Sequence, residues 1–235
     1  MAQRNRGKQS KDDDFFAPKW HPIFTSAIDD MVYLLSRGYA SGSALQLVGN
    51  RHRLNKRQRL AIQRISTSEQ DAKLRGQKSC PSSSLQGASV EIDGFNLLIL
   101  LEGAISGAYI FQGRDGIYRD ISSVHGSYKR VQQTESAIHL IGNALQSLQV
   151  QSVKWYLDQP ISNSGRLKTR LLEISEQEDW GWEVELVYSP DKVLAQSQQI
   201  VISSDGWILD QATRWFNLGA HLIDAHLPQA NLLKL

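Results

Sequence analysis

The longer, second part of the chain alternates between two hydrophobic patterns. Short apolar runs bounded by turn residues predict buried strands at 90–92, 153–157, 183–188 and 199–202. Between them, apolar residues recur at helical spacing over about 96–106, 134–148 and 166–176. A last helix is predicted around Ile208, Leu209 and Trp215. Strands that alternate with helices are typical of an α/β domain with a parallel sheet, which we predict over 88–235.

The first part of the chain has helical spacing only. One helix is predicted from Pro22 to about Gly38. Its apolar face consists of Phe24, Ile28, Met31, Leu34 and Leu35. Ser41 or Ser43 is the candidate N-cap of a second, short helix, and Asn55 that of a third over 56–65. We therefore predict a small all-α domain over 19–75.

Two further segments have few apolar side chains. Residues 1–18 are polar and charged, which predicts a disordered leader. Residues 76–87 are rich in serine and also contain glycine and proline, which predicts a linker between the two domains.

Charge is unevenly distributed between the two parts. Residues 1–82 hold 15 Lys and Arg against 7 Asp and Glu, and the remaining residues hold 11 against 17. The densest basic cluster lies in the predicted third helix and just before it, at Arg51, His52, Arg53, Lys56, Arg57, Arg59 and Arg64. A basic part can hold RNA, and an acidic part can gather carboxylates around metal ions. The alternatives for the basic helix are a protein-docking face and a solvated surface.

Composition excludes several other classes of site. The single cysteine, Cys80, rules out an internal disulfide framework and a cysteine-rich zinc site, and it favours a cytoplasmic location. No apolar stretch is long enough for a membrane span, and the first residues lack the apolar segment of a secretory signal. The glycine motifs of dinucleotide and nucleoside-triphosphate sites are absent.

Three aspartates directly follow predicted strands. Asp93, Asp158 and Asp205 each stand at a strand end and precede turn-prone residues. The carboxyl ends of parallel strands lie at one edge of a sheet, so these side chains are expected to converge there. Converging carboxylates repel one another unless a cation separates them, and Mg²⁺ or Mn²⁺ prefers such oxygen ligands. The alternative is that Asp93 and Asp205 are N-caps of the following helices.

Four further residues have competing interpretations. Glu102, within an apolar helix, either turns toward the metal site, pairs with an arginine or emerges at the surface. Asp120 is a fourth acid of the site or the partner of Arg119. Ser162 and Ser164 either hold a phosphate in the loop after Asp158 or form an ordinary turn and helix cap.

Short motifs resemble those of a known superfamily over about 86–225. Val90-Glu-Ile-Asp-Gly-Phe-Asn96 resembles the first strand of NYN and PIN-type domains. Val201-Ile-Ser-Ser-Asp-Gly-Trp-Ile-Leu-Asp210 resembles their late strand with its Ser/Thr-rich turn. Trp155-Tyr-Leu-Asp158 and Val187-Tyr-Ser-Pro-Asp191 are similar to two further acid-bearing segments. With Tyr33-Leu-Leu-Ser-Arg-Gly-Tyr39 and Leu47-Val-Gly-Asn-Arg51 in front, the chain resembles a prokaryotic family in which a helical domain precedes a PIN-like domain.

The resemblance implies a three-layer PIN-like fold and a metal-dependent endoribonuclease, and many PIN-like proteins form homodimers. Asp93 matches the first-strand acid and Asp205 the late-strand acid, whereas Asp158 and Asp191 match the other acids less closely. Asn96 would orient Asp93 or contact the phosphate, and Ser204 belongs to the substrate-facing turn. The hairpin predicted at 109–121 around Gly113-Arg-Asp-Gly116 is not part of the common pattern, and a lysine follows Asp191 where a second acid is expected.

We therefore expect a Mg²⁺- or Mn²⁺-dependent ribonuclease with RNA as its partner. Asp93, Asp158 and Asp205 would bind the metal and support attack of water on phosphorus. Asp191, Glu102 and Asp120 are the additional candidate ligands. Candidate substrate-binding residues are Asn96, Ser162, Ser164, Ser204, Arg51, Arg53 and Arg57. The alternatives are a non-catalytic RNA- or protein-binding module with the same fold and a metal-dependent phosphatase.

Overall fold

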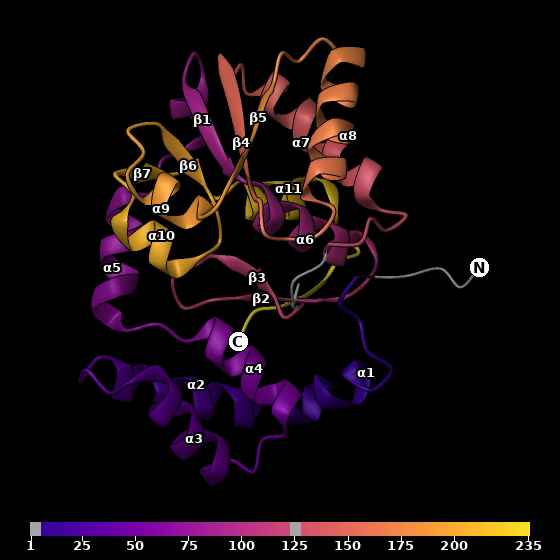
Figure 1. Ribbon diagram of the computed structural model, residues 1–235. Coiled ribbons are helices and arrows are strands. Elements are labelled where there is room, and N and C mark those ends of the chain that lie inside the picture. The colour runs from indigo at the N-terminus through magenta and orange to yellow at the C-terminus, as the bar shows by residue number, and fades with distance from the viewer. Residues whose placement is uncertain (1–5, 123–127) are drawn as a thin grey trace.

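The computed structural model describes residues 6–122 and 128–235 (Figure 1). An N-terminal helical region contains α1 (Asp12–Phe15), η1 (Pro18–Trp20), α2 (His21–Leu35), α3 (Ser41–Arg51), α4 (Lys56–Ile65), α5 (Glu69–Lys78) and η2 (Ser82–Leu85). The α/β unit has strands β1 (Ser89–Asp93), β2 (Tyr109–Gln112), β3 (Tyr118–Asp120), β4 (Ser152–Asp158), β5 (Glu183–Val187), β6 (Ile200–Ile202), β7 (Arg214–Trp215) and β8 (Asn231–Leu233). Its helices are α6 (Gly94–Ile105), α7 (Thr134–Ser147), α8 (Ser164–Gln177), α9 (Pro190–Ala195), α10 (Gly206–Gln211) and α11 (Leu218–His226).

The main sheet is parallel and has five strands in the order β5-β4-β1-β6-β7. The chain runs outward from the central strand β1 to β4 and β5, then returns to add β6 and β7 on the other side. The point where this order reverses lies between β1 and β6, and ligands of open α/β sheets bind at such a point. The predicted α/β class and the predicted strands at 90–92, 153–157, 183–188 and 199–202 are confirmed.

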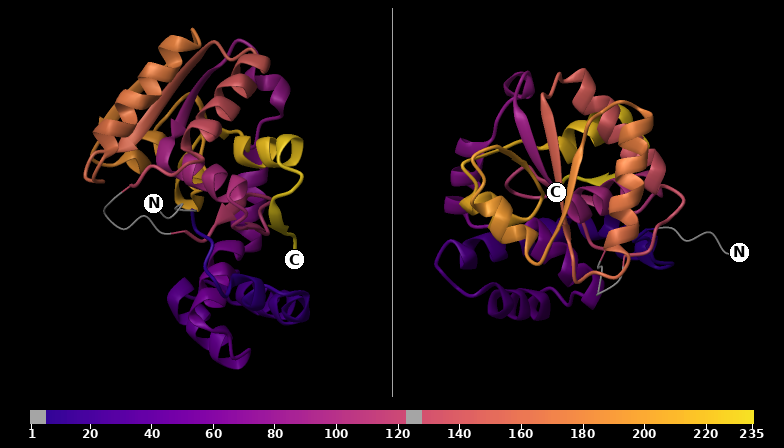
Figure 2. Two further views of the ribbon diagram at one scale, coloured as in Figure 1. Left: turned by 90° about the vertical axis from the view of Figure 1, so that its right-hand side faces the viewer. Right: turned by 45° about the horizontal axis from the view of Figure 1, so that its top comes forward.

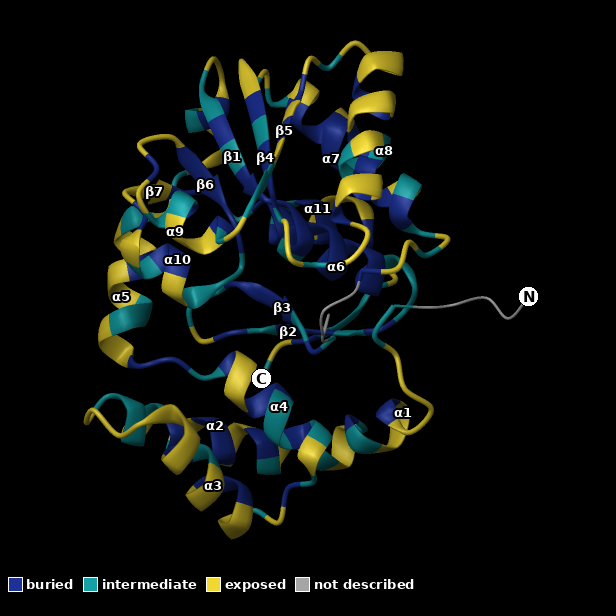
Figure 3. Ribbon diagram, in the orientation of Figure 1, coloured by how far each residue is buried: buried dark blue, intermediate teal, exposed yellow. Residues whose placement is uncertain are grey.

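Alternate residues of the central strands enter two different apolar clusters. On β4, Trp155 belongs to the cluster that contains α6, α7, α8 and α11, whereas Tyr156 packs with α9 and α10. On β6, Ile200 and Ile202 face the first cluster and Val201 the second. Helices therefore cover both faces of the sheet, and α6 is buried along nearly all of its length (Figure 3). This accounts for its continuous apolar sequence.

The helical region shares its core with a second, three-stranded sheet. In this sheet β2 pairs antiparallel with β3, as the predicted hairpin requires, and parallel with β8. Phe111, Ile121 and Leu233 pack in one apolar cluster with the buried side chains of α2, α3 and α4. The helical region thus lies against the hairpin, at the end of the α/β unit toward which the β1 strand runs (Figures 1 and 2). Asn55 caps α4 with a capping box, as predicted.

The described part of the predicted leader is folded, so that prediction is wrong for residues 6–18. The Asp12 side chain is completely buried and accepts hydrogen bonds of 2.9 Å from both Nε and Nη2 of Arg57. Phe16 is also buried, in the core of the helical region. Composition did not reveal this, because the partner of Asp12 lies 45 residues further along the chain.

The predicted linker at 76–87 is a packed connection. The amide N of Cys80 donates to the carbonyl oxygen of Trp215 at 2.8 Å, and Leu85 is buried in the core of the α/β unit. Trp215 itself was predicted to lie in the last helix. It lies instead in β7, which extends the sheet beside β6, because α10 ends at Gln211.

Within residues 6–122 and 128–235, no helix has both the length and the apolar composition needed to cross a bilayer.

Replacement of Asp12 tests the folded N-terminal segment. Asp12→Ala leaves the guanidinium of Arg57 buried without its carboxylate, and we expect a loss of about 3 kcal/mol in the free energy of unfolding, measured by urea denaturation. Asp14→Ala is the matched control, because Asp14 is exposed on the same short helix. Equal denaturation midpoints for the two variants would show that this segment does not contribute to the folded unit.

Candidate active site

A cleft of about 350 Å³ lies at the carboxyl ends of β1, β4 and β6. Five aspartates line it, together with side chains of the hairpin and of α4. The aspartates are Asp93, Asp120, Asp158, Asp191 and Asp205. The structure therefore brings together the three strand-end acids predicted from the sequence and two of the three additional candidates.

Asp93 occupies the end of the central strand and is buried. Its Oδ2 accepts a hydrogen bond of 2.8 Å from Oγ of Ser203 on the neighbouring strand end. Burial raises its pKa, the hydrogen bond from Ser203 lowers it, and the negative charges of Asp191 and Asp205 raise it again, so that the pKa lies at about 7. Asp93 therefore exchanges its proton near neutral pH, and a cation in the cleft would favour the charged form.

A glycine allows α6 to begin directly beside β4. A Cβ atom on Gly94 would stand 2.5 Å from Cδ2 of Leu157 and 3.1 Å from the carbonyl oxygen of Tyr156. A larger residue would push the helix away from the sheet. Since Asp93 is also the N-cap of this helix, the close approach fixes the carboxylate at the strand end. The N-cap interpretation of Asp93 is confirmed, and the same residue also lines the cleft.

Asp158 carries the clearest unsatisfied acceptor of the cleft. Its Oδ1 is buried and has no hydrogen-bond partner among the described residues. Burial raises the pKa of this carboxyl group. A buried acceptor without a partner costs free energy, and a bound cation or an ordered water would satisfy it.

Asp191 is electrostatically central to the acidic cluster, although the sequence made it an uncertain candidate. Burial raises its pKa, and the charges of Asp205 and Asp158 raise it further. It also raises the pKa of Asp93. Asp191 reaches this position because α9 begins at Pro190, directly after the chain leaves β5. In the sequence, Asp191 follows a proline at the start of a short helix, and this context indicated only weakly that it belongs to the site.

The turn after β6 is held against the turn after β1. Oδ1 of Asn96 accepts hydrogen bonds from the amide of Ser204, at 3.2 Å, and from its hydroxyl group. Ser203 Oγ, which donates to Asp93, accepts from the amide of Asp205 at 3.0 Å. Asp205 in turn caps α10. Asn96 and Ser204 line the cleft as predicted, and their contact fixes the distance between the two strand ends.

One wall of the cleft is basic. Arg64, an exposed residue of α4, and Arg119 of β3 both line it. Asp120 lies at this wall: burial raises its pKa, and the hydrogen bond from the Ser122 amide and the positive charge of Arg64 lower it. Asp120 therefore lines the same cleft as the other aspartates, and the predicted pairing of Asp120 with Arg119 is wrong. Arg119 instead forms ion pairs with Asp115.

Arg64 and Arg119 were not among the predicted site residues. Arg64 lies in the basic helix that the sequence identified, but helical spacing alone could not select it from its basic neighbours. Arg119 lies beside Asp120 in a hairpin with no counterpart in the resembled family. The helical region therefore contributes to the cleft through Arg64, at the end of α4 nearest to the hairpin.

Glu102 is not part of the cleft. It is fully buried, and its Oε2 forms an ion pair of 2.7 Å with Nε of Arg6. Its Oε1 accepts hydrogen bonds from the hydroxyl groups of Tyr128 and, at 2.5 Å, Thr134. The prediction that Glu102 binds the metal is wrong, and the arginine-pair alternative is correct.

The predicted phosphate loop after Asp158 does not face the acids. Ser164 is buried at the start of α8, and its hydroxyl donates to the carbonyl oxygen of Gln159 at 3.3 Å. The carbonyl oxygen of Ser162 accepts from the amide of Tyr128 at 3.1 Å. Neither serine lines the cleft, and neither caps α8, whose N-cap is Asn163.

The other basic candidates also lie away from the cleft. Arg57 is occupied by Asp12 and by the carbonyl oxygens of Gly7 and Ile121, so its predicted role in RNA binding is wrong. Arg51 is exposed and pairs with Asp30 at 3.3 Å. Arg53 is exposed in the turn between α3 and α4. None of the three lines the cleft.

The donor atoms of the cleft suit a hard divalent cation, since they are carboxylate oxygens and one of them lacks a partner. In residues 6–122 and 128–235, no three His, Cys, Asp or Glu side chains lie close enough to one another to hold one ion. Mg²⁺ commonly binds through one or two carboxylates, with water and substrate phosphate completing its shell. Asp93, Asp158, Asp191 and Asp205 fit this kind of site.

Two family models match the chain, one over each part. Residues 82–221 match the family described as "Domain of unknown function (DUF5616)", and residues 23–78 match "Protein of unknown function (DUF434)". An uncharacterized protein of Methanocaldococcus jannaschii is 36% identical over 183 residues, which are 78% of this chain and 87% of that protein. No solved structure matches the chain.

The raised pKa of Asp93 predicts a pH-dependent gain in stability for Asp93→Asn. The folded pKa of about 7 exceeds the unfolded value of about 3.9, so the folded protein binds the extra proton between these values. The contribution of Asp93 to stability is present at low pH and is lost as the pH rises to about 7. In EDTA near pH 8, we expect Asp93→Asn to unfold at a higher urea concentration than wild type. The corresponding gain in the free energy of unfolding is at most about 4 kcal/mol.

The gain should be almost gone near pH 4, where the folded Asp93 is neutral, and absent below about pH 3, where Asp93 is neutral in both states. Asp179→Asn is the control, because it removes an exposed carboxylate outside the cleft. If Asp93→Asn is less stable than wild type near pH 8, the ionised carboxylate of Asp93 does not destabilise the folded protein, and the prediction is wrong.

Proposed function

We propose that this chain, which belongs to the family described as domain of unknown function DUF5616, is a Mg²⁺- or Mn²⁺-dependent ribonuclease. One observation carries the proposal: Asp93, Asp158, Asp191 and Asp205 meet in a single cleft at the carboxyl ends of adjacent parallel strands. Burial, and then the negative charges of neighbouring aspartates, raise the pKa values of Asp93 and Asp191, so the ionised forms of these groups cost free energy. A cation would remove this cost.

One or two of the four aspartates would hold the ion, with water and substrate phosphate completing its shell, and the resemblance to PIN-type domains supports the same group of acids. When bound, Mg²⁺ or Mn²⁺ supplies Lewis acidity toward a phosphate and lowers the pKa of water. Asp93 would release its proton as the ion binds, because its pKa of about 7 lies near neutral pH. Ser203 and Asn96 keep the two strand ends in register while this charge changes.

The basic wall favours a polyanionic substrate. Arg64 is exposed, lines the cleft and belongs to the basic part of the chain. Arg119 is already bound to Asp115 and to the carbonyl oxygen of Ser204, so it supports the turn and leaves Arg64 to meet a phosphate. Phe95 and Ile161 add apolar surface beside the acids, which suits a ribose or a base.

The second candidate function is an RNA-binding module without hydrolysis. The spacing of the acids favours it, because the described residues include no ready group of three ligands. The two candidates agree on RNA as the partner and differ in whether a divalent ion binds and supports cleavage.

Calorimetric titration with Mn²⁺, followed by incubation with labelled single-stranded and structured RNA, tests the proposal. We expect wild type to bind Mn²⁺ and to cut RNA. Asp93→Asn and Asp191→Asn should each lose at least about 100-fold in cleavage rate, since even the loss of a group that supports a metal ligand costs 10- to 100-fold. Asp179→Asn, with the same charge change at an exposed position, should behave as wild type.

RNA binding without Mn²⁺ binding or cleavage would favour the non-catalytic module. Equal cleavage by wild type and both cleft variants would rule out the aspartates as the catalytic site.

A further inference from the structure

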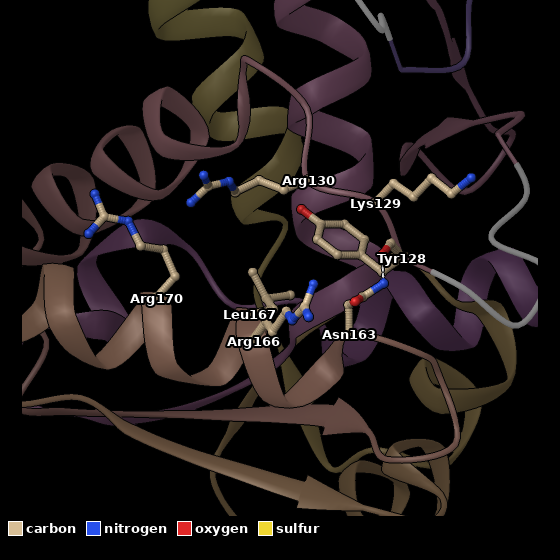
Figure 4. Close-up of a pocket in the computed structure, with 7 residues that line it drawn as sticks. All are labelled: Tyr128, Lys129, Arg130, Asn163, Arg166, Leu167 and Arg170. Carbon is tan, nitrogen blue, oxygen red and sulfur yellow. Dashed lines mark hydrogen bonds between the residues drawn. The ribbon is translucent and has the colours of Figure 1, made fainter.

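A second hollow, of about 420 Å³, lies beside the cleft and is lined mainly by cations (Figure 4). Two segments form it: the chain at 128–130, and α8 with the residue just before it. Its lining residues are Tyr128, Lys129, Arg130, Asn163, Arg166, Leu167 and Arg170. Figure 4 shows the two segments facing each other, with Arg130 of one and Arg166 and Arg170 of the other on one side of Tyr128 and Lys129 extending away on the other side. We call it the basic pocket.

The basic pocket has more positive charge than its neighbours neutralise. Arg170 pairs with Glu135 and Glu173, each at 3.0 Å, and Arg130 approaches Glu135 at 3.5 Å. In the described parts of the chain, neither Lys129 nor Arg166 has an acidic partner within 4.0 Å. Two cations are therefore left to attract an anion.

The start of α8 adds to this positive potential. Asn163, its N-cap, has a left-handed backbone (φ 72°) and makes no side-chain cap hydrogen bond. Its amide Nδ2 donates instead to the carbonyl oxygen of Tyr128 at 2.9 Å. The first turn of a 14-residue helix thus begins at the pocket without a side-chain cap, and helix N-termini favour phosphate groups.

The walls of the pocket are fixed to each other before any ligand binds. The Tyr128 amide donates to the carbonyl oxygen of Ser162, and its hydroxyl donates to the buried Glu102. The guanidinium of Arg6 lies 4.9 Å from the centre of the Tyr128 ring and pairs with the same glutamate. A pocket whose walls are already arranged pays a smaller ordering cost when it binds an anion.

The loop after β4 separates the pocket from the acidic cleft. Ile161 lines the cleft and Asn163 lines the pocket. Their α-carbons are two residues apart, which spans at most about 7 Å of backbone. An RNA strand with one phosphate among the aspartates therefore reaches the basic pocket within a few nucleotides.

We propose that the basic pocket binds a phosphate of the same single RNA strand whose scissile phosphate lies in the acidic cleft. This inference rests on the proposed ribonuclease function and specifies its substrate: a single strand that crosses the 159–163 loop and extends into the pocket. Arg166 and Lys129 supply the charge, and the first turn of α8 supplies backbone amides. The pocket binds only a phosphate of the strand, so no base has to enter it.

Fluorescence anisotropy with labelled single-stranded RNA in EDTA tests this site without cleavage. We expect Arg166→Gln to weaken binding several-fold and to lower the slope of log K against log salt by about 1, the effect of one lost phosphate contact. Lys168→Gln is the matched control on the same helix, since Lys168 does not line the pocket. It should leave affinity and slope unchanged.

A scan with a single uncharged methylphosphonate linkage locates the contact. At one position of the RNA, the losses from the linkage and from Arg166→Gln should not add, because both remove the same interaction. Additive losses at every position, or equal losses for Arg166→Gln and Lys168→Gln, would overturn the proposal in favour of diffuse attraction. Competition by inorganic phosphate in wild type, without a non-additive position, would indicate a site for a free anion and overturn it as well.

Cleavage in Mn²⁺ separates this inference from the proposed function. If wild type binds RNA with the predicted coupling but does not cut it, the ribonuclease proposal fails and the subsite stands as an RNA contact. If wild type cuts RNA and Arg166→Gln has an unchanged KM and kcat, the subsite proposal fails and the function stands. Absence of any RNA binding overturns both.

Discussion

A buried carboxylate between two arginines joins the parts of this molecule that form the cleft. The side chain of Asp115 is completely buried and accepts hydrogen bonds from Arg119, at 2.8 and 2.7 Å, and from Arg75, at 2.6 Å. Burial alone would raise its pKa, and the two guanidinium groups hold the pKa below its usual value. Arg75 of α5 also forms two hydrogen bonds with Asp210 of α10, and Arg119 donates to the carbonyl oxygen of Ser204. Because such a network is costly when a member is missing, it holds hairpin, helical region and strand-end turn together.

The cleft consequently has two walls of different origin. The aspartates of the acidic wall lie at the carboxyl ends of parallel strands, where the following helices begin. The position of this wall therefore follows from the sheet topology. The basic wall belongs to the hairpin and to α4, which reach it through long-range packing. Arg64 of this wall comes from the basic first part of the chain, whereas Arg119 comes from the acidic second part. The positive charge of Arg64 lowers the pKa of Asp120, so this charge acts on at least one of the acids in the cleft.

Sequence reasoning located those features that depend on local pattern. Asp93, Asp158 and Asp205 follow apolar runs, and parallel strands bring such positions together whatever the details of packing. The central place of Asp191 depends on the path of α9 across the sheet, which no local pattern encodes. One hydrogen-bond acceptor of Arg119, the carbonyl oxygen of Ser204, lies 85 residues away, and Glu102 pairs with an arginine 96 residues away. An apolar helix with one acid looks the same from the sequence, whether that acid binds a metal or a buried arginine.

The apolar core between the hairpin and the helical region limits how the two segments of the gene can change independently. The two family models meet between residues 78 and 82, yet the core that contains Phe24 and Ile28 also contains Phe111, Ile121 and Leu233. Separation of the two segments would expose both sides of this core to water. The two families are therefore expected to be inherited together, with compensating substitutions on both sides of that shared surface. A recombination event that exchanged one segment alone would have to preserve the shape of the other.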